Sequence, residues 1–296
     1  MSDFDDKLKK KTEMAEEVIE SYLPKEETRQ SDIMRAMNYS VTAGGKRLRP
    51  ILMYEVAMMF GCDSELVKPF MAVMEFIHTY SLVHDDLPAM DDDDYRRGRK
   101  TTHVEFGEAM GILAGDGLLN YAYEIGMNAV VNGKEIEKKA KALKVIADKA
   151  GIYGMVGGQT VDVLSEGKEL DKDMLDYINE RKTGALIEAS MMTGAILGGA
   201  SDEETKIIEK AASYIGMAFQ IQDDILDVIS TSEELGKPIN SDEKNLKSTY
   251  VTIMGLEQAS NEVEWLTDNG IELLKSLNRD NDFLFELIKK LVNRSK

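Results

Sequence analysis

Two aspartate clusters are the residues of this chain with the clearest capacity for chemistry. Asp223, Asp224 and Asp227 are spaced so that a helix would place all three carboxylates on one face. Two carboxylates ~4 Å apart repel by roughly 4 kcal/mol at an effective dielectric constant of about 20. A divalent cation that bridges them removes this cost, so the spacing predicts a site for a hard cation held by oxygen atoms.

The other cluster lies earlier in the chain, where Asp85 and Asp86 end an apolar run and Asp91 follows. Mg²⁺ is usually held by one or two carboxylates together with substrate phosphate oxygens. Each cluster is therefore half of a site, and a diphosphate could supply the other half. Asp92 to Asp94 are interpreted as solvated charge.

Basic residues alternate with the aspartates along the sequence. Gly44-Gly-Lys-Arg-Leu-Arg-Pro50 carries three positive charges behind a glycine pair, and Arg96-Arg97, Lys182 and Lys237 follow. Flexible glycines let backbone amides approach a phosphate, and arginine offers a bidentate fork. Each basic group taken alone could equally pair with surface acids, but together they fit a site for two phosphorylated ligands. His78, on the same apolar run as Asp85, could by itself be a satisfied core histidine.

The elements that must position these residues are helices. Of 296 residues, 43% are hydrophobic and 30% are charged, and only five are proline, which suits a large buried core. Apolar residues recur with helical spacing in most of the chain, whereas strand patterns are weak. We predict one all-α domain over residues 1–296, a single bundle of more than four helices. A first helix ends before Pro24, and further helices are predicted at 51–60, 65–86, 104–130, 134–150, 171–197, 203–230, 249–275 and 281–293.

Composition excludes several classes of partner and site. The formal charge of −18 repels nucleic acids and anionic lipid surfaces. Cys62 is the only cysteine, so an intrachain disulfide and a thiolate metal cage are both excluded. The sequence shows no signal peptide and no apolar run long enough to span a membrane, so a cytoplasmic location is expected.

Several spaced motifs resemble the ordered signature of isoprenyl diphosphate synthases, most closely the short-chain, bacterial farnesyl type of the polyprenyl synthetase family. The motifs are Gly44 to Pro50, His78 to Asp91, Arg96-Arg-Gly98, Gly157-Gly-Gln159, Lys182-Thr183, Gln220 to Asp227, Gly236-Lys-Pro238 and part of Asp242 to Tyr250. The chain departs from this pattern at Lys100, where the family commonly has proline.

The resemblance implies an all-α fold around a deep central cavity, usually a homodimer. It implies a prenyltransferase that condenses isopentenyl diphosphate head-to-tail with dimethylallyl and then geranyl diphosphate. Three Mg²⁺ ions would be held by the aspartates of both clusters, namely Asp85, Asp86, Asp91, Asp223 and Asp227.

The resemblance also implies roles for the basic and polar residues. The allylic diphosphate would be contacted by Arg96, Lys182 and Lys237. Isopentenyl diphosphate would be held by Gly45, Lys46, Arg49, His78 and Arg97. Thr183 and Gln220 would flank the reacting carbons.

Product length is expected to depend on Tyr80 and its neighbour Ser81. Tyr80 lies five residues before Asp85, ~7.5 Å along a helix, where its ring would meet a growing tail. In the family an aromatic residue there accompanies the C15 product, farnesyl diphosphate; the alternative is a C20 geranylgeranyl product.

Three different classes of protein account for fewer of these residues. A class I terpene cyclase shares an aspartate-rich helix but would lack the Gly44–Pro50 loop. A non-catalytic synthase subunit would usually have lost one aspartate cluster, and both are present here. A metal-binding scaffold would not need the basic residues. The prenyltransferase interpretation is therefore favoured.

Overall fold

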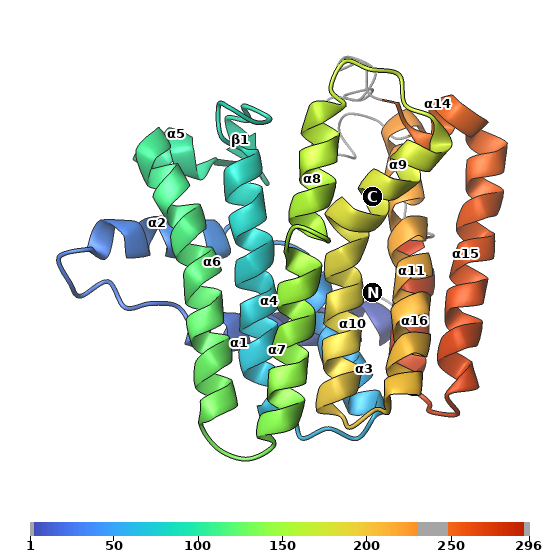
Figure 1. Cartoon of the computed structure of the whole chain (residues 1–296), viewed down its shortest axis with the longest axis horizontal. Coiled ribbons are helices and arrows are strands. Elements are labelled where there is room, and N and C mark those ends of the chain that lie inside the picture. Colours follow the sequence, from blue (N-terminus) through green and yellow to red (C-terminus); the bar gives the residue numbers. More distant parts are fainter. Residues whose placement is uncertain (1–2, 230–247, 293–296) are drawn as a thin grey trace.

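Helices make up about three-quarters of the residues that the computed structural model describes, 3–229 and 248–292 (Figure 1). The helices are α1 Asp3–Ser21, α2 Ser31–Val41, α3 Leu48–Met59, α4 Ser64–Asp85, α5 Thr102–Phe106, α6 Glu108–Val131, α7 Ile136–Ala150, α8 Met155–Leu164, α9 Lys172–Asn179, α10 Ala185–Leu197, α11 Asp202–Ile229, α14 Tyr250–Met254, α15 Leu256–Ser276 and α16 Asp282–Val292. A π-helical turn, η1 Glu180–Gly184, joins α9 to α10, and two short strands are β1 Tyr95–Arg96 and β2 Arg99–Lys100. The predicted all-α class is confirmed.

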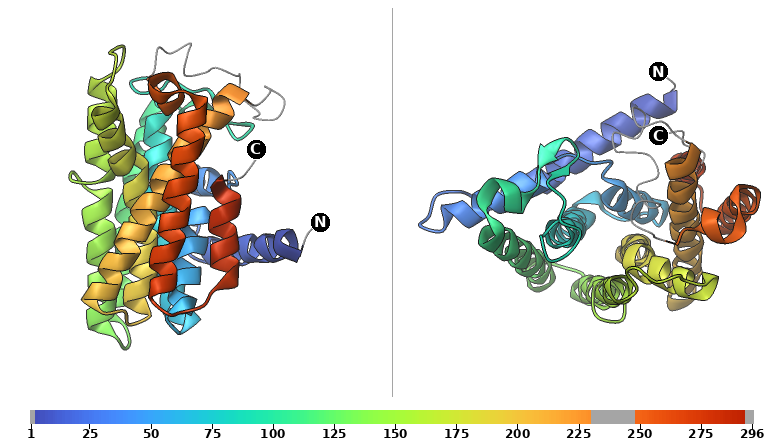
Figure 2. Two further views of the ribbon diagram at one scale, coloured as in Figure 1. Left: turned by 90° about the vertical axis from the view of Figure 1, so that its right-hand side faces the viewer. Right: turned by 90° about the horizontal axis from the view of Figure 1, so that it is seen from above.

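The long helices stand side by side, and α1 crosses them on one side (Figures 1 and 2). α10 contacts α3, α4, α7 and α11, so it occupies the middle of the bundle. All of its residues from Ala185 to Ala195 are buried, which agrees with their nearly unbroken apolar and small character. A helix that is apolar on every face is stable only where neighbours cover all of them.

One large hydrophobic cluster runs from Phe4 on α1 to Leu291 on α16. A smaller cluster gathers residues of α9, α11, α14, α15 and α16 around the buried ring of Tyr250. This continuity favours a single domain, which stays a prediction. In the described ranges no helix combines the length and the apolar character needed to cross a membrane.

Several predicted helices were wrong in their ends or continuity. The predicted helix 104–130 breaks at Gly107 and the predicted helix 249–275 breaks at Gly255, where φ is +89° and +82°. A backbone at these φ values leaves the α-helical region, and glycine adopts it without steric cost. The structure also contains α2 and α8, which were not predicted. α8 opens with Met155-Val-Gly-Gly, and its glycines weaken the helical signal.

Strand patterns are weak in the sequence, yet a short hairpin lies between the first aspartate cluster and α5. β1 and β2 pair antiparallel, with Arg96 opposite Arg99 and Tyr95 opposite Lys100. The turn residues Arg97 and Gly98 have φ of 53° and 75°. Positive φ at both positions is the requirement of a type I′ turn, the connection that matches strand twist in a two-residue hairpin. Arginine is costly in this conformation, so the sequence carries no usual signal for the turn.

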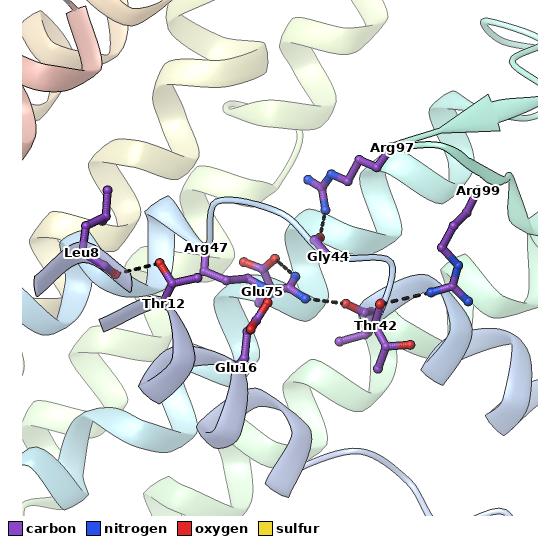
Figure 3. Close-up of polar contacts among 10 residues, drawn as sticks. Leu8, Thr12, Glu16, Thr42, Gly44, Arg47, Glu75, Arg97 and Arg99 are labelled. Carbon is purple, nitrogen blue, oxygen red and sulfur yellow. Dashed lines mark hydrogen bonds and ion pairs between the residues drawn. The ribbon is translucent and has the colours of Figure 1, made fainter. Parts of the chain in front are cut away.

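A buried ion pair joins the loop before α3 to the middle of α4 (Figure 3). Arg47 Nη1 lies 2.6 Å from Glu75 Oε1, and both side chains are about 4% exposed. Arg47 Nη2 also donates to the carbonyl of Val41 at the end of α2, at 2.8 Å, and Arg47 Nε lies 3.6 Å from Glu16 of α1. This one side chain therefore ties α1, α2 and α4 to the loop.

We expect Glu75→Ala to lower the free energy of unfolding by about 3–5 kcal/mol, because it leaves the Arg47 charge buried without its partner. Denaturant titration followed by circular dichroism measures the change. Glu65→Ala is the matched control, since Glu65 pairs with Lys68 at the surface, and its effect should be much smaller. Equal losses in the two variants would contradict a structural role for the buried pair.

Candidate active site

The two aspartate clusters lie at the same end of the bundle, where α4 and α11 both terminate (Figure 1). The chain folds back after α4, so that the Asp91 amide donates to the carbonyl of Asp85 at 2.8 Å. The pKa of Asp85 is raised to about 6, mainly by burial; Lys182 and Arg96 lower it, and the neighbouring Asp91 and Asp86 raise it. Asp85 is therefore a partly buried carboxyl group in the field of charges of both signs.

Asp86 has a different hydrogen-bond partner from Asp85. It is 3% exposed, and its Oδ1 accepts from Arg96 Nε at 2.7 Å and lies 2.6 Å from Arg96 Nη2. Burial raises the pKa of Asp86 even so. Asp86 thus holds Arg96 beside the cluster. Residues 92–94 are all exposed, as expected, although Asp93 lies 3.8 Å from Arg96.

Lys182 and Thr183 sit in the π-helical turn η1. Lys182 Nζ pairs with Asp162 of α8 at 2.6 Å. Burial lowers the pKa of Lys182, but Asp162, followed by Asp85 and Asp91, outweighs it and raises the pKa overall. The turn fits against α8 because Gly158 has no side chain: a Cβ there would lie 2.3 Å from the Lys182 amide nitrogen.

Gln220 approaches the same turn from α11. α11 packs directly on η1, where a Cβ on Gly216 would lie 3.2 Å from the Cα of Gly184. Gln220 follows Gly216 by one helical turn, and like Thr183 it is half-buried. The structure therefore places the two polar residues on adjoining elements.

The second cluster faces the segment that leads into α14. Asp224 Oδ2 accepts from the Tyr250 amide at 2.8 Å, while the Tyr250 hydroxyl donates to Asp176 of α9 at 2.8 Å. Asp224 therefore anchors α14. Asp227 is buried at 4% exposure and Asp223 is half-buried. Lys237 lies outside the described residues, as does the motif from Gly236 to Pro238.

A basic group forms around His78, with Arg49, Arg97 and Arg96 close enough to act on its pKa. Arg49 Nη1 lies 3.3 Å from His78 Nε2, and because a guanidinium can only donate, His78 accepts on Nε2. Burial lowers the pKa of Arg49 to about 10. Burial, then the charges of Arg49 and Arg97, hold the pKa of His78 well below its ordinary value. Cations gathered this closely favour an anionic ligand.

The absence of a side chain at Gly45 leaves room for the Arg97 guanidinium. The Arg97 guanidinium donates to the carbonyl of Gly44 (Figure 3), and a Cβ on Gly45 would lie 2.5 Å from Arg97 Nη1. Gly45 also has φ of +138°. A side chain at Gly45 would thus displace the Arg97 guanidinium; the expected part of Gly45 in substrate binding stays a prediction. Lys46 is exposed beside it.

The donor set fits a hydrated cation that a phosphate completes. Within residues 3–229 and 248–292, no three acidic, histidine or cysteine side chains converge as a preformed metal centre would. Gln159 Nε2 donates to Asp85 Oδ1 at 2.9 Å, while the buried Gln159 Oε1 has no hydrogen-bond partner among the described residues. A metal-bound water would satisfy that oxygen. The Arg49 Nε is likewise buried and unpartnered there, which suits a phosphate oxygen.

Tyr80 lies beneath the acidic end of α4 and is 6% exposed. Its ring meets the His84 ring edge-on at 5.8 Å, and burial followed by Tyr123 and Asp85 raises its pKa to about 12. Ser81 is half-buried and donates to the carbonyl of His78. An uncharged phenol is therefore available as the apolar floor that the sequence predicts.

Some residues that hold the site in shape were not predicted from the sequence. Asp162 supports Lys182, Gln159 contacts Asp85, and Glu75 anchors the basic loop. Gln159 stands in a recognised motif, but no role was predicted for it. Asp162 and Glu75 carry no local signal, because their partners are 20 and 28 residues away in sequence.

A family model, related sequences and solved structures all assign the chain to the same family. Residues 30–281 match the family model described as polyprenyl synthetase. The chain is 39% identical over 298 residues to farnesyl diphosphate synthase of Escherichia coli, covering 99% of this chain and all of that one. It is 44% identical over 227 residues to farnesyl diphosphate synthase of Geobacillus stearothermophilus, covering 77% and 76% of the two chains. A Helicobacter pylori geranyltransferase, solved in complex with magnesium and isoprenyl diphosphate, superposes with a TM-score of 0.82 at 30% identity, covering 99% and 97%.

We expect the pKa of His78 to rise when inorganic diphosphate binds, because the added anion offsets the cations that hold this pKa low. NMR titration of the imidazole signals, with and without diphosphate, measures the shift. Arg97→Gln should raise the pKa of His78 in the free protein, since it removes one of those cations. A His78 pKa that is unaffected by both diphosphate and Arg97→Gln would contradict the proximity of His78 to Arg97 and to an anion site.

Proposed function

This chain belongs to the polyprenyl synthetase family, and we propose that its acidic helix ends and the basic residues around them form one diphosphate-transfer site. The protein is a Mg²⁺-dependent prenyltransferase. It condenses isopentenyl diphosphate head-to-tail with dimethylallyl and geranyl diphosphate to give farnesyl diphosphate. The assignment of individual residues to this reaction is our proposal.

One observation carries the residue assignment: the partly buried carboxyl group of Asp85 lies in the field of both Lys182 and Arg96. The two cations come from distant elements, the π turn and the β hairpin, and each is held by its own buried or half-buried acid. A lone acidic patch would need no such arrangement. A diphosphate that arrives with a divalent cation needs both signs of charge together.

Asp85, Asp86 and Asp91 on one side, with Asp223 and Asp227 on the other, would hold Mg²⁺ on the allylic diphosphate. When bound, Mg²⁺ supplies Lewis-acid neutralisation of the leaving diphosphate. We propose three ions for each site, as the resemblance implies. Lys237 is assigned to the same diphosphate from the resemblance alone.

The chain's own residues act on the allylic substrate at three points. Arg96 and Lys182 neutralise the diphosphate as its bond to carbon breaks, which lowers the cost of the allylic cation. The hydroxyl of Thr183 and the amide oxygen of Gln220 stabilise that cation by their dipoles. The apolar walls around Tyr80 deny it water.

Isopentenyl diphosphate is assigned to the basic group around His78. Arg49, Arg97 and Lys46 would bind its diphosphate, and neutral His78 would donate to it through one ring nitrogen. The double bond then attacks the allylic cation, and a proton is lost. Among the described residues no side chain stands out as the base, so the departing diphosphate is our proposed acceptor.

The homodimer implied by the resemblance stays a prediction. Large apolar side chains at the start of α6 and on and before α8 are exposed, as a covered face would require. They are Ile112, Leu113, Ile152, Tyr153 and Leu164. The cytoplasmic location likewise stays a prediction.

Product assay tests the function directly. We expect labelled isopentenyl diphosphate and geranyl diphosphate to give farnesyl diphosphate only when Mg²⁺ is present, read by chromatography after phosphatase treatment. Asp85→Asn should reduce kcat by about 10²-fold or more, because it removes charge from the metal site. Asp94→Asn is the matched control, since Asp94 is exposed, and it should retain activity. Chain extension without any divalent cation would overturn the proposal.

Tyr80 is predicted to set product length. Tyr80→Ala should shift the main product from C15 to C20 or longer, because the ring that meets the tail is removed. Tyr80→Phe is the matched control and should keep the C15 product, since only the hydroxyl is lost. An unchanged product from Tyr80→Ala would show that the floor lies elsewhere.

A further inference from the structure

The hairpin β1–β2 carries Arg96 and Arg97, yet it is only two residues deep on each strand. A ladder this short cannot hold itself in place in water. Its position must therefore come from contacts outside the hairpin. Asp86 holds Arg96 of the first strand, and α2 and the residue after it hold the second strand.

Tyr39 of α2 and Arg99 of β2 make the central contact. The Arg99 guanidinium carbon lies 4.1 Å from the centre of the Tyr39 ring, within the range of a cation–π interaction. The Tyr39 hydroxyl donates to the Lys100 carbonyl at 2.8 Å. Arg99 Nη1 donates to the Thr42 carbonyl at 3.1 Å (Figure 3). The two side chains thus hold both strand β2 and the residue just after α2.

Neighbouring contacts confirm that α2 is the platform for this region. The Ser40 and Thr102 hydroxyl oxygens lie 2.7 Å apart, joining α2 to the start of α5. The Tyr39 ring also packs edge-on against Phe106 of α5 at 5.3 Å. The hairpin is therefore bound to α2 from its second strand onward.

The chain that leaves α2 continues directly into the glycine-rich loop. Thr42 is followed by Ala43 and Gly44, and the Gly44 carbonyl accepts from Arg97. Arg99 and Arg97 thus meet the loop two residues apart, at Thr42 and Gly44. Because Arg97 has positive φ, its side-chain direction depends on the hairpin turn staying in register with that loop.

We propose that Tyr39 and Arg99 form a clasp that positions Arg97 against the Gly44–Arg49 loop and so sets affinity for isopentenyl diphosphate. Both are positioning residues: the clasp acts through Arg97. This inference rests on the proposed function, which assigns Arg97 to that substrate. Arg96 is secured separately by Asp86, so the clasp should affect the two substrates unequally.

Steady-state kinetics with each substrate varied in turn tests the clasp. Arg99→Ala should raise KM for isopentenyl diphosphate about tenfold, the size expected when one charge-assisted hydrogen bond is weakened. KM for geranyl diphosphate and kcat should change by less than about twofold. Arg99→Lys should recover part of the loss, since lysine keeps the cation over the Tyr39 ring. Tyr39→Phe should have a smaller effect than Tyr39→Leu for the same reason.

Two controls separate the clasp from general damage. Arg35→Ala removes an arginine of α2 that lies away from the hairpin contacts and pairs with Asp32 on the same helix, and it should leave both KM values unchanged. Thermal unfolding followed by circular dichroism should give similar midpoints for Arg35→Ala, Tyr39→Phe and wild type. Equal increases in both KM values for Arg99→Ala, or none, would overturn the clasp.

The His78 titration gives a readout that needs no turnover. If Arg99→Ala releases Arg97, the pKa of His78 should rise, because one of the cations that lowers it moves away. Arg35→Ala should leave it unchanged. Absence of product from the wild-type protein would refute the proposed function, whereas a His78 pKa unmoved by Arg99→Ala would refute the clasp.

Discussion

The buried pair of Arg47 and Glu75 is the interaction on which the candidate site depends. α4 carries Glu75 in its middle and Asp85 at its end, so the pair fixes the basic loop relative to the acidic helix end. Two charges removed from water are tolerated only when geometry and further hydrogen bonds compensate, and the Val41 carbonyl supplies one of these. The loop that gathers cations is thereby anchored through Arg47, whose charge is paired with the buried Glu75.

This anchoring explains how a strongly acidic chain can offer a basic surface to an anion. Arg49 and Arg97 repel one another, and their proximity must be maintained by other contacts. The chain separates the tasks: Arg47 holds the loop, and Asp86 holds Arg96. Arg49 and Arg97 then remain to meet a ligand, since their hydrogen bonds go to His78 and to the Gly44 carbonyl rather than to a carboxylate.

Much of this arrangement could be predicted from the sequence, and the exceptions have physical causes. The apolar length of residues 185–197 and the spacing of Asp223 to Asp227 are local signals, so the core helix and the acidic face could be predicted. The π turn at Glu180–Gly184 has no such signal, because its composition also suits an α-helix; its form depends on the close approach of α8 at Gly158. The hairpin was missed since its turn places arginine where asparagine or glycine is usual. Both exceptions carry residues assigned to substrate.

The positive φ of Arg97 has a consequence for how such a protein can change under selection. A turn of this type is more stable with asparagine at that position, by an amount on the order of 1 kcal/mol. Selection for heat resistance alone would recover that energy early and would remove a guanidinium from the basic group. At this turn, stability of the fold and affinity for an anionic ligand therefore favour different residues, and this chain carries the residue that favours the ligand.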